Sequence, residues 1–185
     1  MISLDQLWIP IVLSAVLVFA ASSLIHMVFK WHNSDYTKLG NEDAVLAAIR
    51  AGNAQPGLYV LPHCSDMKDL QSEDMQRKFR EGPVGFMTLK RPGPPSMGRA
   101  LLQWFVFNLV VAAIVGAIAL RLYGLHGDAH RAACAAAVIS FLTYAGSSLQ
   151  AGIWMGKPWI SVAKDLLDGA IYAGASWAAF FFLWP

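Results

Sequence analysis

Long stretches without a charged residue alternate with polar segments along the chain. Four such stretches occur, at positions 6–29, 100–120, 132–156 and 169–185. A helix needs about 20 apolar residues to cross the roughly 30 Å hydrocarbon core of a bilayer, because each residue adds about 1.5 Å. The last stretch reaches this length if its helix begins near Val162. The pattern therefore predicts four transmembrane helices.

The composition agrees with this prediction. Of the 185 residues, 56% are hydrophobic and only 14% are charged, whereas about a quarter of the residues of a soluble domain carry a charge. Small residues also recur four positions apart, as at Ala112 and Gly116 and at Ala170 and Gly174. Because this spacing places small side chains on one face of a helix, it predicts close contacts between helices.

The basic residues predict how the helices are oriented. Positive charge is retained on the cytoplasmic side of a membrane, and ten of the fourteen Lys and Arg residues lie in one segment. They are Lys30, Lys38, Arg50, Lys68, Arg77, Lys78, Arg80, Lys90, Arg91 and Arg99. This segment is therefore expected inside and both termini outside. A cleaved signal peptide is not predicted, because no basic residue precedes the first apolar stretch.

The long segment between the first two helices is predicted to contain two short helices. Residues 41–43 supply an N-cap and an acidic first turn for a helix that ends at Gly52. A second helix begins at Ser65 or Ser72 and ends at Arg80. Its acidic residues come early and its basic residues late, as the helix dipole favours.

Two short strands are predicted in the same segment, at 57–62 and 84–89. Both are rich in β-forming residues and bounded by Gly and Pro, and we expect them to pair with each other. The predicted fold is thus an α-helical integral membrane protein, a four-transmembrane-helix bundle with a small α+β cytoplasmic insertion between helices 1 and 2. The expected segments are 1–30 for the first helix, 31–98 for the insertion, and 99–185 for the other helices, at about 100–123, 131–156 and 162–184.

Several short segments carry a resemblance to a known family. They are KWHNSDY at 30–36, NEDAV at 41–45, GPVGFMT at 82–88, SMGR at 96–99 and DGAIY at 168–172. With these segments in this order, the chain resembles an uncharacterised family of small bacterial four-helix inner-membrane proteins. That family has no assigned activity. The resemblance implies a bacterial inner-membrane location. In that membrane, the orientation predicted from the basic residues makes both termini periplasmic and the loop 31–98 cytoplasmic.

Polar side chains within the apolar helices are candidates for function, because a membrane makes them costly. On the orientation above, they gather in the cytoplasmic half of the bundle. Spacings of three and four place Ser147 and Gln150 on one face of the third helix, and Asp168 and Tyr172 on one face of the fourth. The candidate cluster comprises His26, Asn108, Ser147, Gln150, Asp168 and Tyr172.

Two interpretations of this cluster stay open. In the first, the cluster forms a polar vestibule that opens to the cytoplasm, in which Asp168 supplies the charge and His26 is its proton partner. Alternatively, its members hydrogen-bond between helices, and Asp168 pairs with Lys164 one turn away.

Metal binding and catalysis have little support in the sequence. His63, Cys64 and Met67 are candidates for a copper or zinc site, because imidazole and soft sulfur suit these metals. No second Cys or His pair accompanies them, as structural zinc sites require, so exposed turn residues are the favoured interpretation. No glycine-flanked serine or Gly-rich phosphate loop occurs. We therefore predict no catalytic residues, metal or cofactor.

Three classes of function remain open. The favoured one is a non-enzymatic accessory or scaffold subunit that docks partners through its cytoplasmic module. The second is a small transporter or channel component that uses the polar cluster. The third is a membrane enzyme acting at the cytoplasmic surface, and its candidate participants are His32, Asp35, His63, Cys64 and Asp168.

The expected partners follow from the same features. They are the lipid bilayer and either a membrane-protein complex or a second copy of the chain. Nucleic acid is not expected as a partner, because the formal net charge is only +2.

Overall fold

The computed structural model describes residues 4–185, so residues 1–3 of the predicted first segment lie outside the described part. The described chain divides into two compact units. The bundle unit contains the residues up to Tyr36 together with Ser96–Pro185, and the inserted unit is Thr37–Pro95.

Four long helices form the bundle unit in the described chain, and all four are long and apolar enough to cross a membrane. The first begins as α1 (Trp8–Ser23) and continues in a π-helical turn, η2 (Leu24–Phe29). The others are α4 (Met97–Tyr123), α5 (Ala129–Met155) and α6 (Trp159–Leu183). The predicted number of helices long and apolar enough to span a membrane is thus confirmed. The fourth begins at Trp159, three positions before the predicted Val162 and directly after Pro158, which is its N-cap residue.

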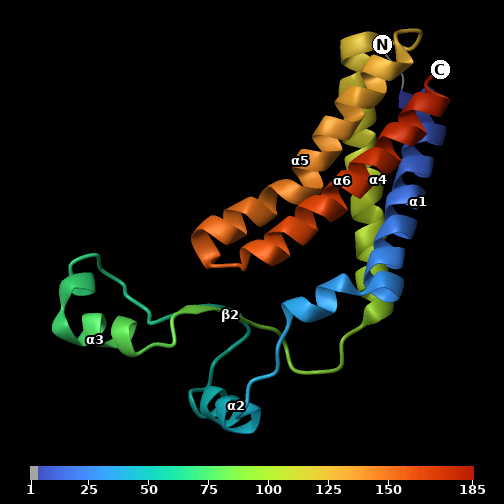
Figure 1. The fold of residues 1–185 in the computed structure, drawn as a ribbon. Helices are drawn as coiled ribbons and strands as arrows, with labels where there is room; N and C mark the ends of the chain where they lie inside the picture. Colours follow the sequence, from blue (N-terminus) through green and yellow to red (C-terminus); the bar gives the residue numbers. More distant parts are fainter. Residues whose placement is uncertain (1–3) are drawn as a thin grey trace. The chain divides into compact units, whose positions relative to one another are not determined.

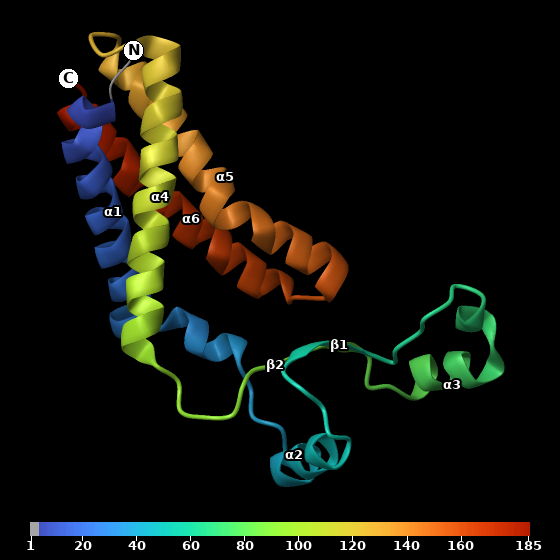
Figure 2. The ribbon, with the colours of Figure 1, turned by 180° about the vertical axis from the view of Figure 1, so that it is seen from behind.

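The helices associate in two pairs that diverge toward one end of the bundle. Helices α5 and α6 lie side by side, as do α1 and α4, and both views show the pairs separating toward the end where η2 lies (Figures 1 and 2). Helix α1 begins at the opposite end, where α6 ends and the α4–α5 turn lies (Figure 1). The two pairs are therefore farther apart at the η2 end than at the opposite end.

The closed end of the bundle holds an apolar core. Phe180 of α6 is fully buried against Val115 of α4 and Ala136 of α5. Gly116 makes this contact possible, because a Cβ at that position would lie 3.3 Å from the Phe180 ring. The outer faces of the helices are also apolar, with Val138 and Leu142 of α5 exposed, as expected for surfaces that contact lipid.

Only some of the small residues contact other helices as predicted. Ala112 and Gly116 are buried, whereas Ala170 and Gly174 are exposed, so the second pair was a wrong prediction. The neighbouring Gly169 makes the close contact instead, and a Cβ there would lie 2.6 Å from the Cβ of Ala145. Successive residues of a helix point about 100° apart, so a shift of one position changes the face.

The inserted unit contains the predicted helices and strands. They are α2 (Glu42–Ala51), β1 (Gly57–Leu61), α3 (Glu73–Glu81) and β2 (Gly85–Leu89), with a 3-10 turn, η4 (Asp69–Gln71). Strands β1 and β2 pair antiparallel, with Tyr59 opposite Met87, which confirms the predicted pairing. The hydroxyl of Ser72 accepts a hydrogen bond from the Met75 amide, so the second helix begins after Ser72 and not at Ser65.

The two units differ in how many of their residues are buried. Met75 is the only buried residue of the inserted unit, all of which the structure describes. Residues 31–36 precede this unit and are grouped with the bundle. Their contacts with α6 explain this grouping.

Candidate functional site

Residues Trp31–Asp35 form a short 3-10 helix, η3, that is attached to the start of α6. The ammonium of Lys164 donates to the Trp31 carbonyl at 2.8 Å, to the Ser34 hydroxyl at 2.8 Å and to the Asp35 carboxylate at 2.6 Å. The Ser161 hydroxyl also donates to Asp35, at 3.0 Å. Two side chains of α6 therefore hold this turn in place.

The same turn supplies both hydrogen-bond donors to Asp168. This carboxylate is only 6% exposed. Its Oδ1 accepts from the Trp31 indole at 3.2 Å, and its Oδ2 accepts from Nε2 of His32 at 2.8 Å. A buried carboxylate costs less free energy when it accepts such bonds. The sequence therefore places an ionisable group within an apolar helix and provides its partners from the adjoining turn.

His32 bridges two carboxylates. Its Nδ1 lies 2.7 Å from Asp35 and its Nε2 lies 2.8 Å from Asp168. Burial by itself lowers the pKa of His32, but the bonds to Asp35 and Asp168 outweigh it and raise the pKa above its ordinary value. An ionised carboxylate only accepts hydrogen bonds, so both ring nitrogens of His32 donate in this arrangement.

Asp35 is ionised at neutral pH. The hydrogen bond from Lys164 is the largest cause that lowers the pKa of this carboxyl, which is about 2. Partial burial opposes the shift, while the bonds from His32 and Ser161 add to it. Asp35 thus remains a charged acceptor for Nδ1 of His32.

The π-helical turn η2 carries the second histidine of the site. Nδ1 of His26 lies 2.9 Å from the Ser22 carbonyl. A carbonyl only accepts, so Nδ1 donates this bond, and Nε2 makes no hydrogen bond within residues 4–185. The His26 and His32 rings stack with their centroids 5.0 Å apart. Single π-helical turns occur frequently at functional sites.

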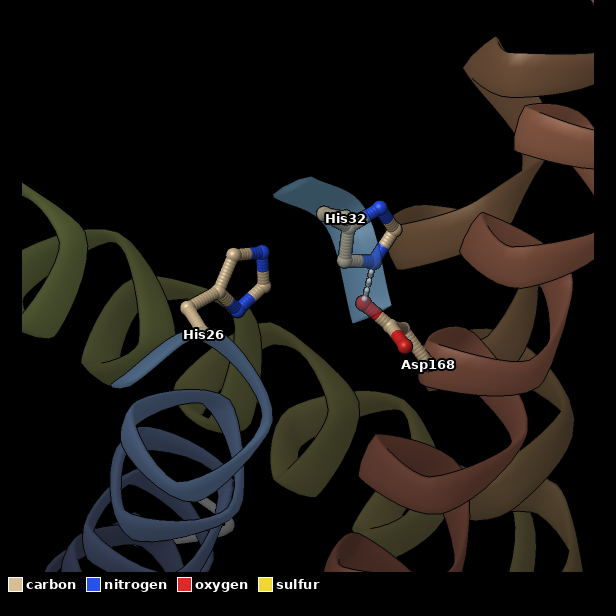
Figure 3. Close-up of side chains that lie close together, drawn as sticks. All are labelled: His26, His32 and Asp168. Carbon is tan, nitrogen blue, oxygen red and sulfur yellow. Dashed lines mark hydrogen bonds and ion pairs between the residues drawn. The ribbon is translucent and has the colours of Figure 1, made fainter. Parts of the chain in front are cut away.

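His26, His32 and Asp168 converge from three separate segments, η2, η3 and α6 (Figure 3). One nitrogen or carboxylate oxygen from each lies within 4.8 Å of the other two. Among residues 4–185, this is the one group of at least three His, Cys, Asp or Glu side chains with a spacing that suits a metal ion.

A half-open cavity of about 690 Å³ adjoins this group, between the two helix pairs. Met97, the first residue of α4, and Lys157, in the α5–α6 turn, line it, so it reaches the η2 end of the bundle. Its aromatic wall comprises Trp104, Tyr144 and Tyr172. This volume lies within the range of small-molecule sites, about 300–1,000 Å³.

The charges on the cavity wall are compensated in pairs. Asp165 accepts hydrogen bonds from the Ser148 hydroxyl and the Lys157 ammonium. Asp168 is paired with His32, as described above. The cavity therefore offers hydrogen-bonding groups and apolar surface without a large excess of either charge.

The structure brings four of the six predicted cluster residues to this cavity, which are His26, Ser147, Asp168 and Tyr172. Asn108 is buried deeper in the bundle, where it accepts a hydrogen bond from the Tyr144 hydroxyl at 3.1 Å. Gln150 is exposed on α5 and is not among the residues that line the cavity.

The partners of the acidic residues differ from those considered from the sequence. Lys164 binds Asp35 instead of Asp168, and Lys157 binds Asp165. Trp31 was not among the predicted cluster residues, although its indole is a donor to Asp168. The one available signal was the polar segment directly after the first span, which also contains His32 and Asp35.

The metal candidates proposed from the sequence lie in the inserted unit. The thiol of Cys64 donates to the Asp66 carbonyl at 2.9 Å, and Met67 is largely exposed. This agrees with their interpretation as turn residues.

The fold and the site together indicate a multi-pass helical membrane protein with a polar cavity between its helices. Comparisons with protein-family models, with curated proteins and with solved structures found no match. The chemistry of the site is therefore inferred from its own residues.

Proposed function

We propose that the protein binds a small amphipathic molecule in the cavity between its helix pairs, as a component of a transport or channel system. The observation that carries this proposal is the position of Asp168, a buried carboxylate on the wall of a cavity of about 690 Å³. An ionisable residue within a spanning helix most often faces a substrate or ion pathway.

The lining of the cavity favours an amphipathic ligand over an ion of high charge. Leu101 and Met27 supply apolar surface, and Trp104 supplies an aromatic face. Ser147 and Ser148 supply hydroxyl groups. Because the carboxylates on the wall are already paired, a ligand with a neutral polar head and an apolar body fits this lining best.

The ligand can be sought without knowing its identity. The protein is extracted in lipid nanodiscs, and the bound small molecules are released and identified by mass spectrometry. Ser147→Trp fills the cavity from α5, whereas Leu142→Trp places the same ring on the exposed face of that helix. We expect one species to be lost from Ser147→Trp and retained by Leu142→Trp. Identical small-molecule contents in the wild type, Ser147→Trp and Leu142→Trp would rule out a ligand bound in the cavity.

We further propose a bacterial inner-membrane location with both termini periplasmic and residues 31–98 cytoplasmic. Ten basic residues in that region support this orientation. A membrane-impermeant thiol reagent is expected to label Cys64 in a Cys134→Ser background only after the inner membrane has been opened. Labelling of Cys64 in cells whose inner membrane is intact would reverse the orientation.

A role as a docking subunit is the second candidate, favoured by the small core of the inserted unit. Only Met75 is buried among Thr37–Pro95, all of which the structure describes, while Leu58 and Phe86 of the strands are exposed. Chemical cross-linking of intact membranes is expected to join Lys68 or Lys78 to one recurring partner. Cross-links confined to this chain would exclude the docking role.

A further inference from the structure

We propose that His26, His32 and Asp168 bind a divalent transition-metal ion, with zinc as the ion that their chemistry suits well. Imidazole nitrogen and carboxylate oxygen are both common zinc ligands. The inference goes beyond the proposed ligand-binding function and does not depend on it.

The distances are close to those of a metal site. His32 and Asp168 already lie 2.8 Å apart through Nε2 and Oδ2, and all three ligand atoms lie within 4.8 Å of one another. Ligand atoms about 2.0–2.2 Å from a tetrahedral zinc ion are about 3.4 Å apart. Binding would require the ligand atoms to approach from within 4.8 Å to about 3.4 Å of one another. The exposed His26 side chain can make this movement, whereas Asp168 is buried and fixed.

The surrounding hydrogen bonds are those that orient metal ligands. A histidine that binds a metal through one nitrogen usually donates its other N–H to a carbonyl or a carboxylate. Nδ1 of His26 donates to the Ser22 carbonyl, and Nδ1 of His32 donates to Asp35. Both histidines are therefore supported through Nδ1, which assigns Nε2 of each to the metal.

The two carboxylates near His32 have different tasks in this arrangement. Asp35 is occupied by Lys164 and Ser161, so it supports His32 and is not itself a ligand. Asp168 accepts from Trp31 through Oδ1, which leaves Oδ2 for the metal. On metal binding, the ion replaces the proton that Nε2 of His32 shares with Asp168.

The ligand set would leave one coordination position open. Zinc sites with three protein ligands keep a fourth position for water or another ligand. His26 and Asp168 both line the cavity described above. The open position would therefore face a space that a small molecule can enter.

Zinc binding to the whole protein tests this inference. The purified chain is freed of metal with a chelator, titrated with Zn²⁺, desalted and analysed for metal content. We expect about one zinc ion per chain, and at least about a hundredfold weaker binding by His26→Gln, since loss of a ligand exceeds the ten- to hundredfold cost of losing a supporting residue. Among the described residues, the His26 ring makes its one hydrogen bond to the Ser22 carbonyl of its own helix, so this variant should fold.

Three further variants make the test specific. His130→Gln removes a histidine that lies near Cys134, outside the proposed site, and is expected to keep full zinc binding. Asp35→Asn should weaken binding about tenfold to a hundredfold, because it removes the support of His32. Asp168→Asn should abolish binding. Co²⁺ in place of Zn²⁺ should give visible absorption bands that disappear in His26→Gln.

Two results would overturn the metal site. The first is the absence of retained zinc in a wild-type protein that elutes as a single folded species. The second is zinc binding of unchanged affinity in His26→Gln, which would place the ion elsewhere in the chain. Zinc binding without any amphipathic ligand would leave the metal site standing and remove only the proposed ligand-binding function.

Discussion

The bundle unit and the inserted unit both contain ion pairs between close neighbours in the sequence, but among the described residues only the bundle unit also contains pairs between distant segments. In the bundle, Lys164 binds Asp35 and His32 binds Asp168, 129 and 136 positions apart. In the inserted unit, Asp74 binds Arg77 and Lys78, three and four positions away. The first set is largely buried and the second is exposed.

The long-range pairs of the bundle fix how its segments are arranged in the tertiary structure. The pairs that Asp74 makes in the inserted unit join neighbours on the surface of one helix. Exposed pairs one turn apart contribute little to stability, because water and salt screen them. The buried pairs of the bundle attach one segment to another and place Asp168 against the cavity. Changes in the bundle should therefore have larger and more distant effects than similar changes in the inserted unit.

The largest effect is expected from Gly169→Ala. The new Cβ would lie 2.6 Å from the Cβ of Ala145 and would force α5 and α6 apart. We expect a loss of about 1–3 kcal/mol in the free energy of unfolding, as for other overpacked contacts. The measurement is unfolding of the purified protein in mixed micelles of mild detergent and sodium dodecyl sulfate.

Gly174→Ala is the matched control on the same helix. A Cβ at Gly174 meets no atom within 4 Å, and alanine favours helix by about 1 kcal/mol over glycine. This variant should be as stable as the wild type or more so. Equal destabilisation by both substitutions would mean that α5 and α6 are not packed through Gly169.

A smaller effect is expected from Lys164→Ala. The substitution removes donors to Trp31, Ser34 and Asp35, so residues 31–36 should lose their attachment to α6. We expect about tenfold faster hydrogen exchange in that segment, since hydrogen bonds to charged groups are among the stronger ones. Exchange is measured by mass spectrometry of peptides from the protein in nanodiscs.

Lys78→Ala provides the comparison within the inserted unit. Lys78 and its partner Asp74 are both more than half exposed, so exchange should remain unchanged outside α3. The distinction between the two units would fail if Lys78→Ala loosened distant segments as much as Lys164→Ala does.

The smallest effect is expected from Ser72→Ala, which removes the N-cap of α3. Loss of such a cap costs about 1 kcal/mol, and the change should be confined to faster exchange in Glu73–Glu81. Ser72→Asp retains a capping oxygen and should restore slow exchange. A change in the spanning helices caused by Ser72→Ala would show unexpected coupling between the units.

The local features of the chain could be predicted from the sequence. Apolar length predicts the four spanning helices, and glycine, proline and capping residues predict the strands and α3. These signals depend on neighbours within one turn or one strand. The same local reasoning placed the candidates His26, Asp168 and Tyr172 in one half of the bundle.

The partners of these residues could not be predicted in the same way. Contact between His32 and Asp168 depends on how a turn after the first span meets the last helix, 136 positions later. The choice of Gly169 over Ala170 depends on the rotation of α6 about its axis. Helical spacing defines faces but does not state which face meets which neighbour.

The existence of a water-accessible cavity between the helix pairs is the central claim, and thiol labelling tests it most directly. Cysteine is introduced at Ser147, which lines the cavity, or at Leu142, which lies on the outer face of the same helix, in a chain with Cys64→Ser and Cys134→Ser. Each protein is placed in nanodiscs and treated with a charged, membrane-impermeant thiol reagent. We predict rapid labelling of Ser147→Cys and protection of Leu142→Cys. Equal protection of both would contradict the cavity and the function proposed for it.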